Sequence, residues 1–501
     1  MSEKRIVYYK DFGAVGDGRT DDFAAIKACH DYANENGCTV RAEEGATYYI
    51  GDTKGAEAIV KTDVDWTGAT FYLDDKAVDV DSPGRGVSLF FAASSFDNWM
   101  TVYDENSEEV KSLAGGIKTT DRHLGYAPGF PALIIIWDHN NYAYNRFGLS
   151  GNGSKTPPAQ RELVVVDAEG NIKEGTECLL EYTGCTKLEV HRIDDEPITL
   201  SGGTFITNAN DAPPEYTSYS RGILIRRSNV TVRGIEHKII GEGERGAPYR
   251  GIIRFERSNN LRINDCIFQS HKVYCDFLED GRIRSRMGTY DFGGNLSNDI
   301  VFKNCTQSNF FKNDGSGRPF GQWENWGIMG SNWTKNITFD SCSLSRFDAH
   351  SGIYNLVIRN TTINNIHLIG GGYALIENCI CYAGSNSLFY LRGDYGSTWK
   401  GTIEIKDCTM IPPREDAYIA SALWFPWSVF GMDTTHMPKI IVDNLKIENF
   451  KGKLYAYRFP DTQGKPIGEK VFPDGTENIN PLDMSAPVIM RNNKERYKII
   501  G

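Results

Sequence analysis

The segment Asn336-Ile-Thr-Phe-Asp-Ser-Cys342 is followed by two variants of the same pattern, Asn355-Leu-Val-Ile-Arg-Asn-Thr361 and Ala374-Leu-Ile-Glu-Asn-Cys379. Each contains a short apolar strand, a polar turn and then a small residue that begins the next strand. The small residues are 19 positions apart at the first step and 18 at the second. Self-similarity at a fixed period of this size is typical of a solenoid, in which each repeat packs only on its neighbours.

The same pattern continues on both sides of this segment, which predicts regular rungs from about residue 200 onward. Longer steps, such as the one from 305 to 342, must contain loops. Further copies are Ser228-Asn-Val-Thr-Val-Arg-Gly-Ile235, Asn260-Leu-Arg-Ile-Asn-Asp-Cys266, Asp299-Ile-Val-Phe-Lys-Asn-Cys305 and Thr402-Ile-Glu-Ile-Lys-Asp-Cys408.

Five of the 11 cysteines occupy the small-residue position of this repeat. We expect them to stack as an inward column, because small buried thiols pack well in a core. An odd number of cysteines also excludes a complete set of disulfides. The expected column consists of Cys266, Cys305, Cys342, Cys379 and Cys408, with Thr361 in the same row.

The N-terminal region has a different signal, the run Lys10-Asp-Phe-Gly-Ala-Val-Gly-Asp-Gly-Arg-Thr-Asp-Asp22. Its three glycines mark a tight loop, and its last three residues supply an N-cap and first-turn acids. These features predict a helix from about Phe23 to Glu35, which Gly37 ends.

This run and the helix after it resemble the opening of the pectin- and pectate-lyase-like superfamily. The resemblance implies an all-β fold, a right-handed single-stranded parallel β-helix with an N-terminal capping helix. An uncapped solenoid end would expose apolar core and strand edges, which explains the cap. Hydrolases, lyases and phage spikes share this fold, so the resemblance leaves the reaction open.

The chain organisation that we expect has four parts, because the pattern changes in regularity along the sequence. They are a cap segment at 1–50, first rungs with long insertions or a side sheet at 51–200, regular rungs carrying a groove at 201–450, and a C-terminal extension packing on the helix at 451–501.

Composition narrows the classes of partner. The formal net charge is −11 and no run of five Lys or Arg occurs, so we expect no nucleic-acid partner. No stretch of 18 apolar residues occurs, so we expect no membrane span. Strand-like sequence begins at once, which favours a cytoplasmic protein or a secreted one whose signal peptide has been removed. The sequence leaves the oligomeric state open.

The candidate site lies on the strand that starts at Ser345. Alternation places Arg346, Asp348 and His350 on one face, opposite the apolar Phe347 and Ala349. A rung of 19 residues then brings Asp348 beside His367, since neighbouring strands are roughly 4.8 Å apart. We expect this polar face to point outward, as the floor of a groove between flanking loops.

Such a group suits proton transfer. A neighbouring carboxylate fixes the tautomer of an imidazole and raises its basicity, and Arg346 can hold an anionic group. The competing interpretation is a solvated ladder of polar side chains. An outward position also predicts that Asp348→Asn costs roughly 0.5 kcal/mol of stability or less.

The run Phe347-Asp-Ala-His350 resembles, in part, the Tyr-Gly-Phe-Asp-Pro-His signature of β-helical mannuronan C5-epimerases. Asp348 and His350 match the signature's Asp and His, while Ser345 replaces its Tyr and Ala349 its Pro. The resemblance implies abstraction of a proton next to a carboxylate, which serves epimerases and lyases alike.

Flanking loops supply candidates for substrate binding, because they combine charged groups with rings that can stack on sugars. We expect Arg392, Tyr390, Asp394, Asp291, Glu324, Trp323 and Trp326 to contribute.

The leading hypothesis is a carbohydrate-active enzyme that acts on an acidic poly- or oligosaccharide by proton abstraction, as a lyase or epimerase. Its catalytic residues would be Asp348, His350 and His367. One alternative is a glycoside hydrolase in which Asp348 pairs with Asp291, Glu324 or Asp394. The other is a non-catalytic glycan-binding spike or adhesin. No cofactor and no metal ligands are predicted, although the loops could form a calcium site.

Overall fold

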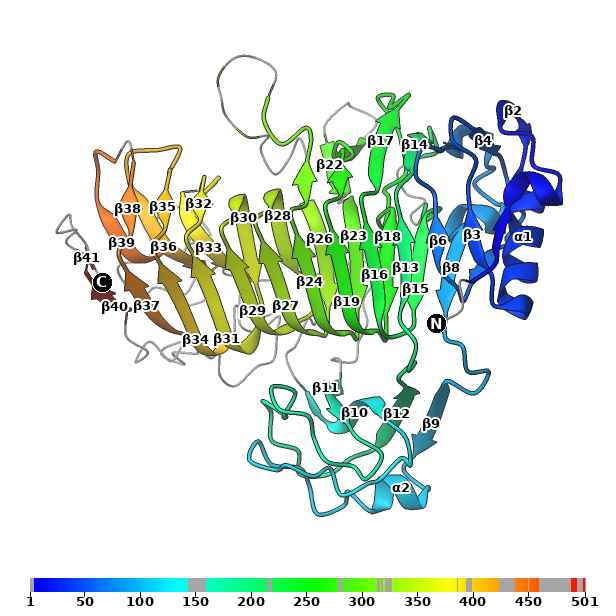
Figure 1. Ribbon diagram of the computed structural model, residues 1–501. Coiled ribbons are helices and arrows are strands. Elements are labelled where there is room, and N and C mark those ends of the chain that lie inside the picture. The colour runs from blue at the N-terminus through cyan, green and yellow to red at the C-terminus, as the bar shows by residue number, and fades with distance from the viewer. Residues whose placement is uncertain are drawn as a thin grey trace. The chain divides into compact units, whose positions relative to one another are not determined.

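In the computed structural model, strands stack side by side and run parallel to one another (Figure 1). The chain folds as a right-handed parallel β-helix, as the repeat and the resemblance predicted. The chain divides into two compact units, one of Met1–Trp99, Ile193–Gly330 and Ser341–Ser345, and one of Met100–Arg192, Ser331–Asp340 and Arg346–Gly501. The structure describes residues 4–142, 159–213, 219–277, 283–287, 289–312, 316, 319, 327–384, 386–392, 399–422, 438–448, 450–458, 488–492 and 499–500.

The first unit contains strands of two parallel sheets. Paired residues carry the apolar pattern inward, as in Val230↔Leu261 and Leu261↔Ile300, where all three side chains are buried. One sheet contains β1 (Ile6–Tyr8), β3 (Thr39–Arg41), β6 (Val64–Asp65), β13 (Ile198–Ser201), β16 (Val230–Arg233), β19 (Asn259–Asn264) and β24 (Asn298–Lys303). The other includes β4 (Thr47–Ile50), β7 (Thr70–Asp74), β14 (Thr204–Asn208), β17 (Glu236–Ile240), β18 (Ile253–Glu256), β20 (Ile267–Phe268), β23 (Tyr290–Asn295) and β25 (Thr306–Gln307).

Helix α1 (Phe23–Asn36) lies where the N-terminal signal predicted it. Gly37 follows it in the left-handed conformation, with φ at 65°, which an L side chain rarely adopts. The apolar face of α1 is buried through Phe23, Ile26 and Ala33. Its capping role stays a prediction.

The second unit repeats the arrangement. Its first sheet contains β27 (Thr334–Asp340), β29 (Ile353–Arg359), β31 (Gly370–Glu377), β34 (Trp399–Lys406), β37 (Lys439–Asp443) and β40 (Val488–Arg491). Its second sheet contains β30 (Thr362–Leu368), β32 (Ile380–Cys381), β33 (Ser387–Leu391), β35 (Thr409–Met410), β36 (Ala417–Ala422), β38 (Lys446–Ile447) and β39 (Leu454–Arg458). Strand β28 (Ser343–Ala349) has residues in both units.

Polar turns connect the rungs as the repeat predicted. A residue with positive φ stands directly before each member of the small-residue row. Several of these side chains bond to the equivalent turn of a neighbouring rung. Asn378 Nδ2, for example, donates to Asn360 Oδ1 over 2.8 Å. Asn and Asp suit these positions because they tolerate the left-handed region and bond locally.

The cysteine column is confirmed within each unit. Cys266, Cys305 and Cys342 are buried on consecutive rungs of the first unit, and Cys379 and Cys408 on consecutive rungs of the second. The cysteines that the structure describes are free thiols. A hydrogen bond with Cys408 and burial raise the pKa of the Cys379 thiol.

We therefore expect the column cysteines to resist alkylation in the native protein and to react fully after denaturation. The reactive form is the thiolate, and burial suppresses both its formation and its access to reagent. Mass spectrometry after brief iodoacetamide treatment would measure this residue by residue. Rapid native labelling of Cys305 or Cys379 would contradict the assigned register.

An antiparallel sheet in residues 100–192, here called the side subdomain, belongs to the second unit. It contains β9 (Met100–Asp104), β10 (Ala132–Tyr142), β11 (Ala159–Val166) and β12 (Lys187–Arg192), in the order β11-β10-β12-β9, with the short helix α2 (Glu108–Lys111). Its core is made by alternate residues of these strands, including Ile134, Ile136, Val164 and Val190.

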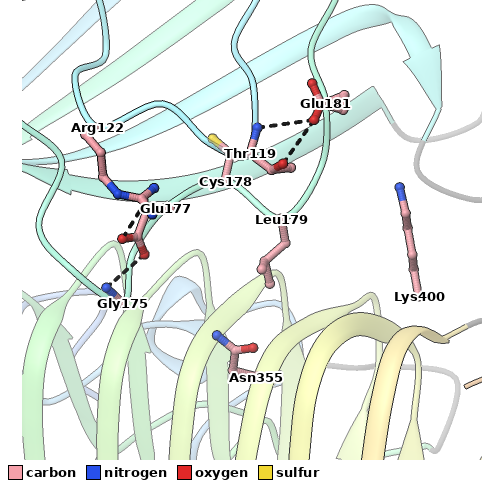
Figure 2. A pocket seen from close by; sticks show the side chains of 9 residues that line it. All are labelled: Thr119, Arg122, Gly175, Glu177, Cys178, Leu179, Glu181, Asn355 and Lys400. Carbon is pink, nitrogen blue, oxygen red and sulfur yellow. Dashed lines mark hydrogen bonds and ion pairs between the residues drawn. The ribbon is translucent and has the colours of Figure 1, made fainter. Parts of the chain in front are cut away.

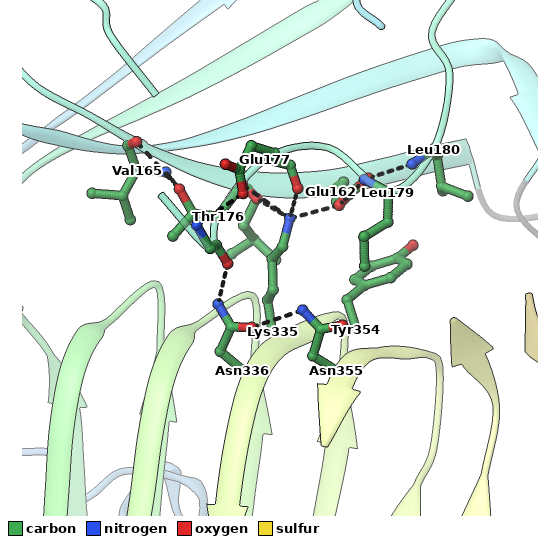
Figure 3. Close-up of polar contacts among 12 residues, drawn as sticks. Glu162, Val165, Thr176, Glu177, Leu179, Leu180, Lys335, Asn336, Tyr354 and Asn355 are labelled. Carbon is green, nitrogen blue, oxygen red and sulfur yellow. Dashed lines mark hydrogen bonds and ion pairs between the residues drawn. The ribbon is translucent and has the colours of Figure 1, made fainter. Parts of the chain in front are cut away.

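A buried lysine connects the side subdomain to the rungs of its unit (Figure 3). Lys335 of β27 is fully buried, and its Nζ donates to Glu162 Oε1 over 2.6 Å and to the backbone oxygens of Leu163, Thr176 and Glu177. The Glu162 carboxylate in turn accepts from the backbone N–H groups of Leu179 and Leu180. The pair is therefore fully hydrogen-bonded, the condition under which buried charges are tolerated.

Replacing Lys335 by Met should lower the free energy of unfolding by about 3 kcal/mol, because it leaves the Glu162 carboxylate buried without its counter-ion. Urea denaturation would measure the loss. Lys111→Met removes an exposed ion pair with Glu108 and should change stability by less than about 1 kcal/mol. Equal effects of the two changes would show that Lys335 contributes no more than a surface charge.

Candidate active site

Five side chains of the second unit form what we call the arginine cluster: Arg346, Asp348, His367, Tyr390 and Arg392. Arg346 and Asp348 alternate along β28, and His367 stands on β30 in register with Tyr390 of β33. Arg392 follows β33 directly, and its backbone N–H donates to Leu368 O. Neighbouring strands β27 and β29 show the predicted step of 19, in the pair Thr334↔Ile353.

Asp348 is shared by both arginines. Its Oδ2 accepts from Arg346 Nη2 over 2.6 Å and its Oδ1 from Arg392 Nη1 over 2.5 Å. Burial alone would raise the pKa of Asp348, but Arg346 and then Arg392 outweigh it and hold this pKa well below its usual range. Two cations facing one anion give the cluster a net positive charge.

The predicted exposure of this face is wrong. Asp348 is 0% exposed and Arg346 only 4%, so this polar face is mostly covered rather than open to solvent. Strand alternation separates two faces but does not show whether either meets water. Burial is possible here because the carboxylate and guanidinium groups neutralise one another.

His367 differs from the imidazole that the sequence predicted. Its ring is buried and stacked on Tyr390, with centroids 4.8 Å apart and planes at 21°. Burial, and then the charge of Arg346, lower its pKa well below the usual value, although Asp348 acts in the opposite direction. Asp348 therefore raises the pKa of His367 as expected, but burial first, and then the two arginines, outweigh this effect. Nε2 of this neutral ring has no hydrogen-bond partner among the described residues.

His350 lies at the margin of the cluster. It follows β28, is half-buried, and its backbone N–H donates to Ser331 O. Its charge, when present, helps to lower the pKa of Asp348, so the ring lies near that carboxylate. Asn364 and Asn365 of β30 are also buried, although they were not predicted as site residues. The absence of a side chain at Gly384 leaves room for their amide groups.

Four predicted binding residues lie outside the described residues: Asp394, Glu324, Trp323 and Trp326. Parts of the flanking loops that were expected to border a groove also lie outside the described residues. The groove and these contacts therefore stay predictions.

Asp291 belongs to a separate polar group in the first unit. It is buried on β23, and its Oδ2 accepts from Ser270 Oγ over 2.7 Å and from Gln307 Nε2 over 2.9 Å. Oδ1 has no hydrogen-bond partner among the described residues. Burial raises the pKa of Asp291 to about 6, so the carboxyl is partly protonated near neutral pH.

A second carboxylate of this group, Glu242, was missed by sequence reasoning. It accepts from His271 Nδ1 over 3.1 Å and from Tyr274 OH over 2.8 Å. Burial would raise its pKa, but His271 and the hydrogen bonds outweigh burial and lower it. Its charge contributes to the raised pKa of Asp291, so the two carboxyl groups lie within electrostatic reach. Glu242 stands in a Gly-flanked loop, without a strand pattern that could have placed it.

Among the residues that the structure describes, no three His, Cys, Asp or Glu side chains converge as a metal site would require. The helices in the described part are too short or too polar to cross a bilayer.

These features define a parallel β-helix protein. No family model matches the chain, and no curated protein does. Similar solved structures include the surface adhesin PfbA of Streptococcus pneumoniae (TM-score 0.43, 12% identity, 97% of this chain and 100% of that one). Another is the mannuronan C-5 epimerase AlgE4 A-module of Azotobacter vinelandii (0.40, 11%, 99% and 98%).

A third is the tailspike protein gp49 of Pseudomonas phage LKA1, with a TM-score of 0.42, 14% identity, and coverage of 90% of this chain and 78% of that one. At such identities the likeness concerns the fold and does not extend to function. The fold assignment itself rests on the strand pairing described above.

Proposed function

We propose that this chain is a carbohydrate-active enzyme that abstracts a proton next to the carboxylate of an acidic glycan, as a lyase or an epimerase. The arginine cluster is its reaction centre. The observation that carries the proposal is the pairing of two guanidinium groups, with net positive charge, beside the neutral imidazole of His367. A uronate presents the matching groups, a carboxylate and an acidic C–H beside it.

In this mechanism Arg346 and Arg392 bind the uronate carboxylate, since each guanidinium has several N–H donors. Their charge stabilises the carbanion that forms beside the carboxylate. His367 Nε2 accepts the proton from C5. In a lyase the electron pair then forms the C4–C5 double bond and the glycosidic oxygen leaves C4; in an epimerase a proton returns to the opposite face of C5.

Asp348 has a different role from the one that its motif suggested. A carboxyl whose pKa is held well below the usual range is a weak base. Its two ion pairs instead fix the guanidinium groups of Arg346 and Arg392 relative to His367. We therefore assign Asp348 as a positioning residue.

Incubation with a panel of uronate-containing polysaccharides and neutral glycans tests the proposal. Elimination gives an unsaturated uronate that absorbs ultraviolet light, and epimerisation in deuterated water gives deuterium at C5. The expected result is one of these signals on an acidic glycan, lost in Arg392→Ala. New reducing ends without either signal would overturn proton abstraction.

A second candidate, glycoside hydrolysis, is favoured by the first unit. Asp291, with its pKa raised to about 6, could serve as general acid, and Glu242, with its lowered pKa, as base or nucleophile. Environments that separate the pKa values of two carboxyl groups are typical of acid–base pairs. If hydrolysis is the activity, Asp291→Asn should abolish the new reducing ends while Arg392→Ala retains them.

A non-catalytic adhesin or spike is the remaining alternative. It predicts binding to a glycan of the panel without any product, and unchanged binding in His367→Gln.

A further inference from the structure

The second unit contains a pocket away from the arginine cluster, between two loops of the side subdomain and the ends of rung strands (Figure 2). Its volume is about 550 Å³, within the range of roughly 300–1,000 Å³ typical of small-molecule sites. The lining residues are Thr119, Arg122, Gly175, Glu177, Cys178, Leu179, Glu181, Asn355 and Lys400.

One wall of the pocket, the loop 175–181, is held in place from behind. Lys335 binds the backbone oxygens of Thr176 and Glu177, and Glu162 binds the N–H groups of Leu179 and Leu180 (Figure 3). Asn336 Nδ2 also donates to Gly175 O over 2.9 Å. The buried ion pair thus fixes the loop before any ligand arrives, which lowers the entropic cost of binding.

The opposite wall is open because of a glycine run in β31. Tyr354, Gly371 and Lys400 are register partners on three successive strands, so no side chain stands between the two outer ones. Gly372 has a φ of +89°, and a Cβ there would lie 2.8 Å from Leu179 Cδ1. The positive φ, and the 2.3 Å at which a Cβ would lie from Asn355 Oδ1, therefore favour glycine at this position.

The charged side chains of the pocket differ in how many hydrogen bonds and ion pairs they form. Glu177 receives a loose ion pair from Arg122 at 3.7 Å and a hydrogen bond from Gly175 N. Glu181 Oε1 accepts from both the N–H and the hydroxyl of Thr119, whereas its Oε2 has no partner among the described residues. Lys400 forms no hydrogen bond or ion pair within the described part of the chain, and Figure 2 shows it alone at one side of the pocket.

We infer that this pocket is a further binding site for uronate units of an acidic glycan, outside the reaction centre. The carboxylate of the sugar pairs with Lys400, and its hydroxyl groups donate to Glu181. A neutral sugar would leave Lys400 without an anionic partner. A simple anion would leave the Glu181 carboxylate without a hydrogen-bond donor. The inference rests on the proposed function for the class of ligand, and it adds a place where the polymer is held without being changed.

The test is binding of sodium galacturonate and glucuronate as single sugars, with galactose and glucose as neutral controls. Ligand-observed NMR on the full chain gives the dissociation constants. In an Arg392→Ala background, which disables the arginine cluster, uronate binding should persist. Adding Lys400→Ala should then weaken it by about three- to ten-fold, and Lys400→Arg should largely restore it.

Lys439→Ala is the matched control, because Lys439 is an exposed lysine on the adjacent strand of the same sheet and does not line the pocket. It should leave binding unchanged. If Arg392→Ala removes uronate binding and Lys400→Ala does not, the proposed function stands and this inference is overturned. If Lys400→Ala leaves binding unchanged in the Arg392→Ala background, this inference is overturned, and the glycan panel alone decides the proposed function.

Discussion

Asp348→Asn should lower the free energy of unfolding by about 3–5 kcal/mol, far more than the roughly 0.5 kcal/mol that the sequence suggested. The substitution keeps the size of the side chain but removes the charge that both arginines share. Arg346 and Arg392 would then face each other in a buried environment without a counter-ion. Breaking a buried pair by removing one partner is costly for this reason.

Chemical denaturation would measure the change, with Asp340→Asn as the matched control. Asp340 also pairs with an arginine of its unit, but Arg359 is half-exposed, so that change should cost less than about 1 kcal/mol. Equal losses in the two variants would show that Asp348 is no more than a surface ion-pair partner.

The same variant should alter the pH dependence of stability. The folded pKa of Asp348 lies well below the unfolded value of about 3.9, so the unfolded state binds the proton first as the pH falls. Its contribution is therefore complete above about pH 5 and is lost progressively as the pH falls below about 4 towards the folded pKa. Asp348→Asn should flatten this part of the stability profile.

The repeat predicted the rungs well because each physical constraint acts locally. A residue with positive φ before every small buried residue favours Asn or Asp, which occupy all these positions except Ser341, and inward stacking favours Cys or Thr. The bare rung of 19 residues likewise predicted Asp348 beside His367, and each of these residues shifts the pKa of the other.

Register across loops could not be predicted. His367 pairs with Tyr390, a step of 23 residues, because the chain leaves the sheet between β32 and β33. Without that step the sequence could not show that Arg392 reaches the carboxylate of Asp348. The ion pair between Lys335 and Glu162 could not be predicted either. Glu162 is 173 residues away and belongs to an antiparallel sheet outside the repeat.

The burial of the polar face was the other feature that the sequence could not predict. Arg346, Asp348 and His350 read as a solvated stripe, because alternation is the same for a wet face and for a covered one. Whether this face can be buried depends on Arg392, which comes from another part of the chain and binds the second carboxylate oxygen of Asp348. The positioning role that we propose for Asp348 rests on that contact.

His367→Gln should reduce turnover on the identified acidic glycan by about 100-fold or more, the scale of a lost general base. Glutamine retains a neutral polar side chain but has no nitrogen lone pair that can take a proton. Substrate binding should persist, since Arg346 and Arg392 remain, so the loss should fall on kcat rather than on KM. His139→Gln, which changes an exposed histidine of the side subdomain, is the control and should keep full activity.

The pH profile gives this prediction a second readout. Because the pKa of His367 lies well below its usual value, the imidazole is already neutral at pH 6.5, and activity should stay level through neutral pH. Activity should fall only at strongly acidic pH, where His367 takes up a proton. Asp348→Asn removes a charge that raises the pKa of His367, so any remaining activity should extend further into acid.

The double variant, Asp348→Asn with His367→Gln, should lose less activity than the product of the two single losses, since Asp348 and His367 act as one unit. Near-full turnover in His367→Gln would show that another residue is the general base. Asp291 and Glu242 would then be the leading candidates for the catalytic residues.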